Sequence, residues 1–272
     1  VVLSTVRPTA SIDGTPFWLV QEVAANQVDH YISTPTLSFD HFGTPFVSWS
    51  SVSTAAGNNT VHLSQRGSLG LWNTRDLATA NGIGLRTSLS FDRSERPAVA
   101  WVNTDTSVQG SFNYAAAQSI AANGASASSP VISLSYDLAG VQRGMFAGMS
   151  AGSLSAINHN GSSFSSGAMT SLSGIESLLD ASMTTDDRGL RHVATRVNLM
   201  GGGMGITLSS EPVGGGTWSS SIFTTAASVD GVDIARDPTD GRIGFAYTTF
   251  DNITSRLFYA KFDGFQIQTT QI

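Results

Sequence analysis

One pattern occurs twice in this sequence and limits what the chain can fold into. Residues 36–49 read TLSFDHFGTPFVSW, and residues 87–101 read TSLSFDRSERPAVAW. In each copy an alternating apolar segment ends in an aspartate, and a proline, a valine and a tryptophan follow this aspartate by five, seven and nine positions. Alternation with a period of two is typical of a half-buried β-strand, so each copy predicts two short strands joined by a tight turn.

Three weaker copies extend the pattern over the rest of the chain. Their aspartates are Asp137, Asp186 and Asp237, so the five aspartates, counted from Asp40, are 52, 45, 49 and 51 residues apart. Each copy is followed by a third alternating segment and, in most copies, by a turn and a fourth. A period near fifty with four short strands per unit is typical of the blades of a β-propeller.

The units resemble those of the β-propeller superfamily over about 240 of the 272 residues, a length that follows from the repeat period. No named blade motif matches: the Gly-His and Trp-Asp pairs of WD40 units are missing, and segments near Asp13 and Asp40 differ from a sialidase Asp box in the offset of the glycine. The resemblance therefore implies a fold and little chemistry. We expect an all-β chain in which residues 1–272 form a single β-propeller with four-stranded antiparallel blades.

The number of blades has two interpretations. In the first, five repeats lie near residues 36–86, 87–131, 132–180, 181–231 and 232–272, and residues 1–35 form an N-terminal hairpin that closes the ring. In the second, residues 8–17 echo residues 35–46 and form a sixth inner hairpin, which gives six blades with one incomplete. The spacing favours five blades.

The composition excludes several functions. A net charge of −6 without a basic cluster argues against a nucleic-acid surface, because phosphates are neutralised by several cations along one face. No apolar run approaches the roughly 20 residues that cross a bilayer, so we expect no membrane insertion. Cysteine is absent, and Lys261 is the only lysine among many Ser, Thr and Gly residues. This composition is typical of exported bacterial surface proteins, and we expect a secreted or cell-surface location.

The five repeated aspartates are the first candidates for catalysis. A carboxylate at the end of a strand commonly accepts hydrogen bonds from the following turn, and this role explains five copies better than five catalysts would. A five-bladed glycoside hydrolase, which needs two carboxylates near the channel, is the alternative. Only Glu176 of the four glutamates is placed to approach the axis, so we expect no catalytic residue and a chain that is not an enzyme.

Metal binding has equally little support. The five histidines include no pair with ligand spacing, and we therefore expect no metal site and no cofactor. Asp105 and Asp251 fall in equivalent loops after the second strand, and with Asn252 beside Asp251 their oxygens form the one arrangement suited to Ca²⁺.

The remaining hypothesis rests on the loops between blades and between second and third strands. They are rich in Asn, Ser, Thr and Gly with interspersed aromatic residues, which suits hydrogen bonding to a polar ligand. We therefore predict that this loop face binds a glycan or a protein partner. The candidate ligand-binding residues are His30, Tyr31, Asn58, Asn59, Arg86, Asp105, Asp251 and Asn252. A structural role, in which the N-terminal hairpin adds strands to a neighbouring subunit of a homo-oligomer, is a further alternative.

Overall fold

The described chain consists of β-strands arranged in five sheets and one separate hairpin. The computed structural model describes residues 2–7, 17–23, 30–33, 35–53, 58–80, 82, 86–122, 125, 132–136, 142–148, 152–213, 217–226, 228–237, 240–250, 253–262 and 266–272. Within this part of the chain, no helix is long and apolar enough to span a membrane.

We call the five sheets blades 1 to 5, in chain order. Blade 1 contains β3 (His30–Ile32), β4 (Thr36–Phe39), β5 (Pro45–Ser53), β6 (Asn59–Arg66) and β7 (Trp72–Ala80). Blade 2 contains β8 (Arg86–Phe91), β9 (Pro97–Val102), β10 (Val108–Phe112) and β11 (Gln118–Ala121). Blade 3 contains β12 (Ile132–Tyr136), β13 (Gln142–Ala147), β14 (Ser153–His159) and β15 (Phe164–Ser171).

The last two blades have the same plan. Blade 4 contains β16 (Ile175–Thr185), β17 (Arg191–Leu199), β18 (Met204–Ser210) and β19 (Ser219–Ala226). Blade 5 contains β20 (Ser228–Arg236), β21 (Ile243–Phe250), β22 (Ser255–Phe262) and β23 (Ile267–Gln271). Neighbouring strands within the blades are antiparallel, and in blade 1 both β3 and β4 pair with the long strand β5.

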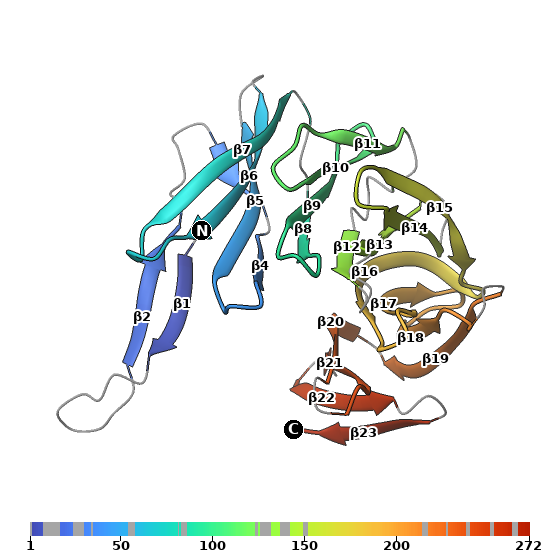
Figure 1. Cartoon of the computed structure of the whole chain (residues 1–272). Coiled ribbons are helices and arrows are strands. Elements are labelled where there is room, and N and C mark those ends of the chain that lie inside the picture. Colours follow the sequence, from blue (N-terminus) through green and yellow to red (C-terminus); the bar gives the residue numbers. More distant parts are fainter. Residues whose placement is uncertain are drawn as a thin grey trace.

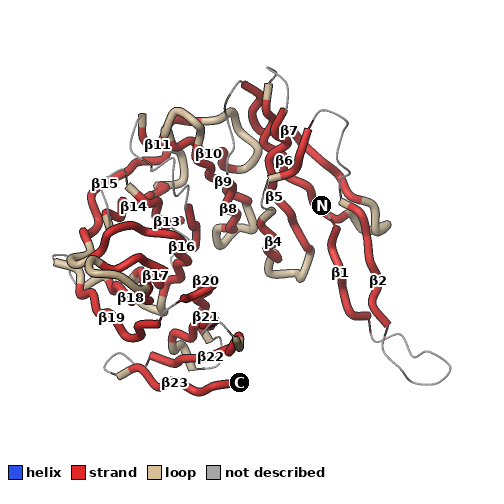
Figure 2. The backbone as a smooth tube through the Cα atoms, turned by 180° about the vertical axis from the view of Figure 1, so that it is seen from behind, coloured by secondary structure: helices blue, strands red, loops and turns tan. Residues whose placement is uncertain are grey.

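The blades are arranged around a common axis with their first strands innermost. Strands β4, β8, β12, β16 and β20 face this axis, and each blade lies beside the next (Figure 1). Two opposite views show an arc that is open between blade 5 and blade 1 (Figure 2). The all-β, five-bladed β-propeller expected from the repeat is therefore confirmed.

The N-terminal strands stand apart from the blades. β1 (Val2–Arg7) and β2 (Phe17–Glu22) form a two-stranded antiparallel sheet of their own. Residues 8–16, on which the six-bladed interpretation depends, lie outside the described residues. Closure of the ring by this hairpin stays a prediction.

Three of the repeated aspartates have the turn role that the sequence predicts; Asp137 lies outside the described residues, and the carboxylate of Asp237 pairs with Lys261 at 3.4 Å. Oδ1 of Asp92 accepts the backbone N–H groups of Ser94 and Arg96, both at 2.9 Å. Asp186 does the same for residues 188 and 190, and Asp40 accepts the N–H group of residue 44 at 2.7 Å. These carboxylates fix the turns that join the first two strands of blades 1, 2 and 4.

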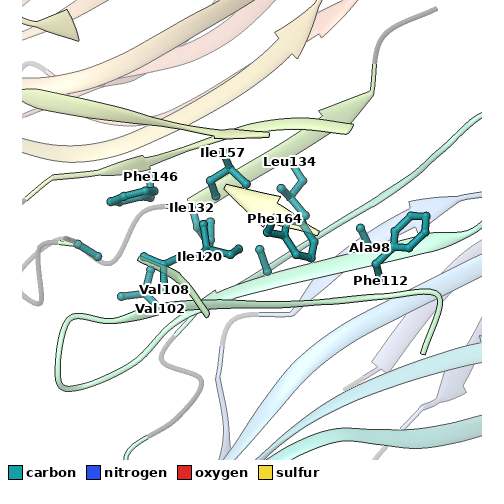
Figure 3. Close-up of a cluster of buried hydrophobic side chains, with 12 residues drawn as sticks. Ala98, Val102, Val108, Phe112, Ile120, Ile132, Leu134, Phe146, Ile157 and Phe164 are labelled. Carbon is teal, nitrogen blue, oxygen red and sulfur yellow. The ribbon is translucent and has the colours of Figure 1, made fainter. Parts of the chain in front are cut away.

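The hydrophobic core lies between consecutive blades, and we call each such contact a junction. Figure 3 shows the junction of blades 2 and 3, where small residues such as Ala98 meet larger side chains such as Leu134 and Phe164. All the residues of this cluster are at least nine-tenths buried. Burial of apolar surface contributes roughly 25 cal/mol per Å², so the junctions, rather than any single blade, supply most of the driving force for folding.

Candidate functional site

The loop residues predicted to bind a ligand lie in two separate places, as far as the structure describes them. Tyr31, Asn58 and Asn59 lie together at one end of blade 1, because β3 and β6 both pair with β5 there. Tyr31 and Asn58 are exposed, whereas Asn59 is buried and its Oδ1 accepts the N–H group of Ser53 at 2.9 Å. His30 is the first residue of β3. Asp251 and Asn252 lie outside the described residues.

Arg86 and Asp105, both from blade 2, are each engaged by a structural partner. Nη1 of Arg86 lies 3.1 Å from Oδ1 of Asp180 and so links blade 2 to blade 4. Oδ1 of Asp105 accepts the hydroxyl of Ser107 at 2.6 Å and its backbone N–H at 3.0 Å. These bonds from Ser107 lower the pKa of Asp105, which is stabilised as a carboxylate within its own turn.

A polar pocket lies at the outer part of the junction between blades 1 and 2, and we call it the Tyr114 pocket. It has a volume of about 470 Å³, which is within the usual range for small-molecule sites. Its described lining is Gln65, Trp72, Asn73, Thr74, Arg75 and Tyr114. None of these is a carboxylate. A wider hollow of about 850 Å³ adjoins it and shares Gln65.

Strand register explains why three of these side chains project into the junction. In the β6–β7 pair, Gln65 is opposite Asn73 and Leu63 is opposite Arg75. Directly opposed residues project from the same face of a sheet. Leu63 packs against the blade 2 side chains Leu89 and Trp101, so this face of β6 and β7 is the one turned toward blade 2.

An unusual turn between β10 and β11 positions Tyr114. Asn113 and Tyr114 have φ angles of 50° and 62°, in the left-handed region that bulky L-residues rarely adopt. Two consecutive residues of this kind cost about 1–3 kcal/mol each. The turn is held by bonds from Asn113 N–H to the Pro97 carbonyl and from Ala115 N–H to the Phe112 carbonyl. The surrounding structure thus keeps the tyrosine ring against blade 1 despite local strain.

Arg75 and Tyr114 form the centre of the pocket. The guanidinium carbon of Arg75 lies 4.5 Å from the centroid of the Tyr114 ring, a cation–π arrangement. Within the described part of the chain, Arg75 has no carboxylate partner. Burial raises the pKa of Tyr114 while Arg75 opposes this shift, and the phenol stays protonated near neutral pH. Its hydroxyl is 3.5 Å from Oε1 of Gln65, which is a long hydrogen bond.

The next two junctions are filled at the corresponding depth. Between blades 2 and 3, the ring of His159 lies 4.1 Å from that of Phe112 and 4.5 Å from that of Phe164, and Gln118 bonds to the backbone of blade 3. Between blades 3 and 4, Arg191 pairs with Glu211 at 2.9 Å and also bonds to residue 158. The first junction is therefore open to a ligand where these two are not.

Sequence reasoning missed this pocket for a definite reason. It placed the ligand at the loops that precede β3, β8 and the third strands, whereas the Tyr114 pocket is formed by third and fourth strands and the turn between them. The available signal was the pair Asn113-Tyr114 in a turn position where blade 3 has Asn160-Gly161. A tyrosine at such a position has a backbone cost that glycine avoids.

The five blades and the polar pocket at a junction define a β-propeller with one candidate ligand site. No known protein family and no curated protein matches the sequence. Solved structures are similar in fold, and three of them follow. BP39L lectin from Burkholderia pseudomallei has a TM-score of 0.65 and 12% identity, with coverage of 100% of this chain and 81% of that chain.

The other two similarities have the same character. AofleA from Arthrobotrys oligospora has a TM-score of 0.55 and 13% identity, covering 100% of this chain and 85% of that chain. A protein of unknown function from Dyadobacter fermentans DSM 18053 has a TM-score of 0.62 and 10% identity, covering 92% and 85%. At these identities the likeness establishes the fold alone.

Proposed function

We propose that this protein is a non-catalytic β-propeller that binds a glycan in the Tyr114 pocket. The observation that carries the proposal is Arg75, a cation without a carboxylate partner among the described residues, stacked on a tyrosine that a strained turn holds in place. Strained residues persist where the surrounding structure over-determines them and are concentrated at ligand sites. The fold similarity to a protein named as a lectin agrees with this proposal.

The chemistry of the lining suits a sugar. Guanidinium and amide groups donate hydrogen bonds to hydroxyl oxygens, and the amide oxygens of Gln65 and Asn73 accept them. An aromatic ring supplies an apolar surface for the C–H face of a pyranose. Trp72 alternates with Asn73 along β7, and its side chain packs with Val47 and Trp49 on the opposite face of blade 1, so the donors of the pocket are those of Gln65, Asn73 and Arg75.

A carboxylate-dependent hydrolase has less support. Hydrolysis of a glycosidic bond uses two carboxyl groups about 5–9.5 Å apart on either side of the bond. Asp40, Asp92 and Asp186 are instead occupied by the N–H groups of their own turns. The described lining of the Tyr114 pocket contributes no carboxylate.

A glycan array followed by calorimetric titration tests the proposal. We expect a glycan ligand whose Kd rises at least tenfold in Arg75→Ala, a loss of about 1.4 kcal/mol or more. Arg75→Lys should lose most of the affinity as well, because ammonium lacks the planar face that stacks on tyrosine. Arg93→Ala is the matched control, since Arg93 is exposed in a turn of blade 2 and outside the pocket.

Three results would overturn the proposal. These are an array without a glycan ligand, an affinity that Arg75→Ala leaves unchanged, and a bound glycan that the protein cleaves. If the array is negative but a protein is captured through the same pocket, the glycan assignment is wrong and the protein-partner alternative takes its place.

A further inference from the structure

Two of the junctions between blades place the same position of the later blade in contact with the earlier one. In the junction of blades 1 and 2, Phe91, which immediately precedes the turn aspartate of blade 2, packs on Phe46 of blade 1 with ring centroids 4.8 Å apart. In the junction of blades 3 and 4, Thr185 precedes its aspartate in the same way, and its hydroxyl is 3.3 Å from Ser135 of blade 3. In these two junctions the residue before the turn aspartate contacts the forward face of the preceding blade, whereas its counterpart in blade 3, Tyr136, is 45% exposed.

Backbone hydrogen bonds repeat with the same register. The N–H of Leu134 donates to Oγ of Ser88 at 2.9 Å, and the N–H of Met183 donates to Oγ of Ser133 at 3.2 Å. In both bonds the acceptor stands four positions before its turn aspartate, and the donor stands three positions before the aspartate of the next blade. Blades 2 and 3 therefore present a serine acceptor at the same position to the blade that follows, whereas at the junction of blades 4 and 5 the equivalent Ser182 donates to Oδ1 of Asp233 at 2.7 Å.

The first strand of blade 1 has the inserting residues, but among the described residues no earlier blade receives them. Its Leu37-Ser38-Phe39 is the same sequence as Leu89-Ser90-Phe91 in blade 2. Leu89 and Phe91 are 4% and 3% exposed, whereas Leu37 and Phe39 are 43% and 53% exposed. Water-exposed apolar side chains in a row of this kind mark an unfilled contact.

Blade 5 has the complementary face. The register places Ala235 where Ser135 stands in blade 3, and Gly244 where Phe46 stands in blade 1. These small residues line a pocket of about 280 Å³ together with Ala246 and Tyr259. A forward face of small residues is also what receives Leu134 in the buried junction of blades 2 and 3, where Ala98 and Ala100 form it.

We propose that β4 of one copy of this protein docks on the forward face of blade 5 of a second copy, in the register of the internal junctions. Phe39 then packs over Ala235 against the ring of Tyr259, which covers Gly244, and Leu37 lies beside Ala246. The contact uses different surfaces on the two copies and can continue from copy to copy.

The second copy is preferred to the chain's own β4 for a mechanical reason. The four internal junctions are packed, with clusters whose members are nine-tenths or more buried. Bringing β4 onto blade 5 within one chain would rotate blades against these junctions, because the arc is open on that side (Figure 1, Figure 2). Packed interfaces do not deform continuously, whereas a second copy docks without disturbing them.

Disulfide trapping tests the proposal in a chain that has no cysteine of its own. The Phe39→Cys and Ala235→Cys single variants are mixed, one carrying a mass tag, and oxidised. The internal counterparts of these positions, Thr185 and Ser135, have side-chain oxygens 3.3 Å apart, a separation that suits a disulfide. We expect a covalent heterodimer from the mixture, and a ladder of oligomers from the double variant.

The controls keep the outcome unambiguous. Leu71→Cys, at another exposed apolar position on blade 1, should give no heterodimer with Ala235→Cys. A double variant that forms only an intramolecular disulfide would show closure within one chain and overturn the proposal, as would the absence of any disulfide. Analytical ultracentrifugation gives an independent measurement. Phe39→Asp should convert assemblies to folded monomers, while Leu71→Asp and Arg75→Ala should leave the mass distribution unchanged.

Discussion

The hairpin turns depend on single residues that have a positive φ angle. Gly43 and Gly189 follow their turn aspartates by three positions and have φ angles of 76° and 77°. Glu95 occupies the same position in blade 2 with φ of 59°, and its carboxylate accepts the N–H group of His41 from blade 1 at 2.7 Å. Glu95 is thus unfavourable for the backbone of the turn, but its carboxylate connects blade 2 to blade 1.

Substitution of Gly43 should reveal the cost of this backbone conformation. A Cβ at Gly43 meets nothing within 4 Å, so Gly43→Ala introduces no clash and reports only the φ of 76°. We expect a loss of about 1–2 kcal/mol in the free energy of unfolding. Gly167→Ala is the matched control, because Gly167 lies in an exposed strand, also has open space, and has no positive φ. Equal effects of the two substitutions in urea denaturation would contradict this explanation.

At the scale of the element, the hairpin with its buried aspartate is the unit that the sequence repeats. Asp92 is buried, and its second oxygen accepts Nε of Arg96 at 2.7 Å in addition to the turn bonds. Asp186 and Arg188 have the same arrangement in blade 4. Because the carboxylate satisfies several donors at once, its loss leaves more than one of them without a partner.

We expect Asp92→Ala to destabilise the protein by about 1–3 kcal/mol, since buried N–H groups lose their acceptor. Asp92→Asn should cost less, because its amide oxygen still accepts from the turn. Asp40→Ala should have a smaller effect than Asp92→Ala, since Asp40 is only partly buried and its side chain accepts the turn N–H group of Thr44, whereas Asp92 accepts two turn N–H groups and the Arg96 guanidinium. The midpoints of denaturant unfolding measure all three. A neutral Asp92→Ala would show that the turn does not depend on its carboxylate.

The strand pattern and the turn aspartates were predictable because they follow from local chemistry that recurs in each unit. The Tyr114 pocket was not, since it depends on a left-handed tyrosine and on the way two blades meet. The exposure of Phe39 could not be predicted from the sequence either. Its local sequence is that of the buried Phe91, and the difference arises from what stands beside each strand.

For the molecule as a whole, buried ionisable groups make stability depend on pH. Burial lowers the pKa of His159 and His192 below their ordinary value of 6.5. Hydrogen bonds to the carboxylates lower the pKa of Asp186 and Glu211 against the opposing effect of burial. All four groups bind protons more readily in the unfolded chain, so acid favours unfolding.

We therefore expect Tm to fall as the pH decreases below about 6.5, through the histidines, and to fall further near and below pH 4.5 through the carboxylates. We assign the fall of Tm between pH 6.5 and 5 to His159, because its Nδ1 accepts the Gly161 N–H group at 3.2 Å only when the imidazole is neutral. His159→Gln should flatten the Tm profile between pH 6.5 and 5 while leaving the decline below pH 4.5. A profile with an unchanged slope would exclude His159 as the responsible group. Calorimetric scans at constant ionic strength provide the measurement.

Blade 2 contacts its two neighbours through opposite faces of its sheet, so the segment that forms it is a unit that can be repeated. Residues 87–131 insert Leu89 and Phe91 backward and present Ala98 and Ala100 forward. A second copy of this segment placed after the first would meet a forward face made of the same small residues that now receive Leu134. Gene duplication can therefore lengthen the arc, and a designer could add or remove one blade at a time without creating a new interface.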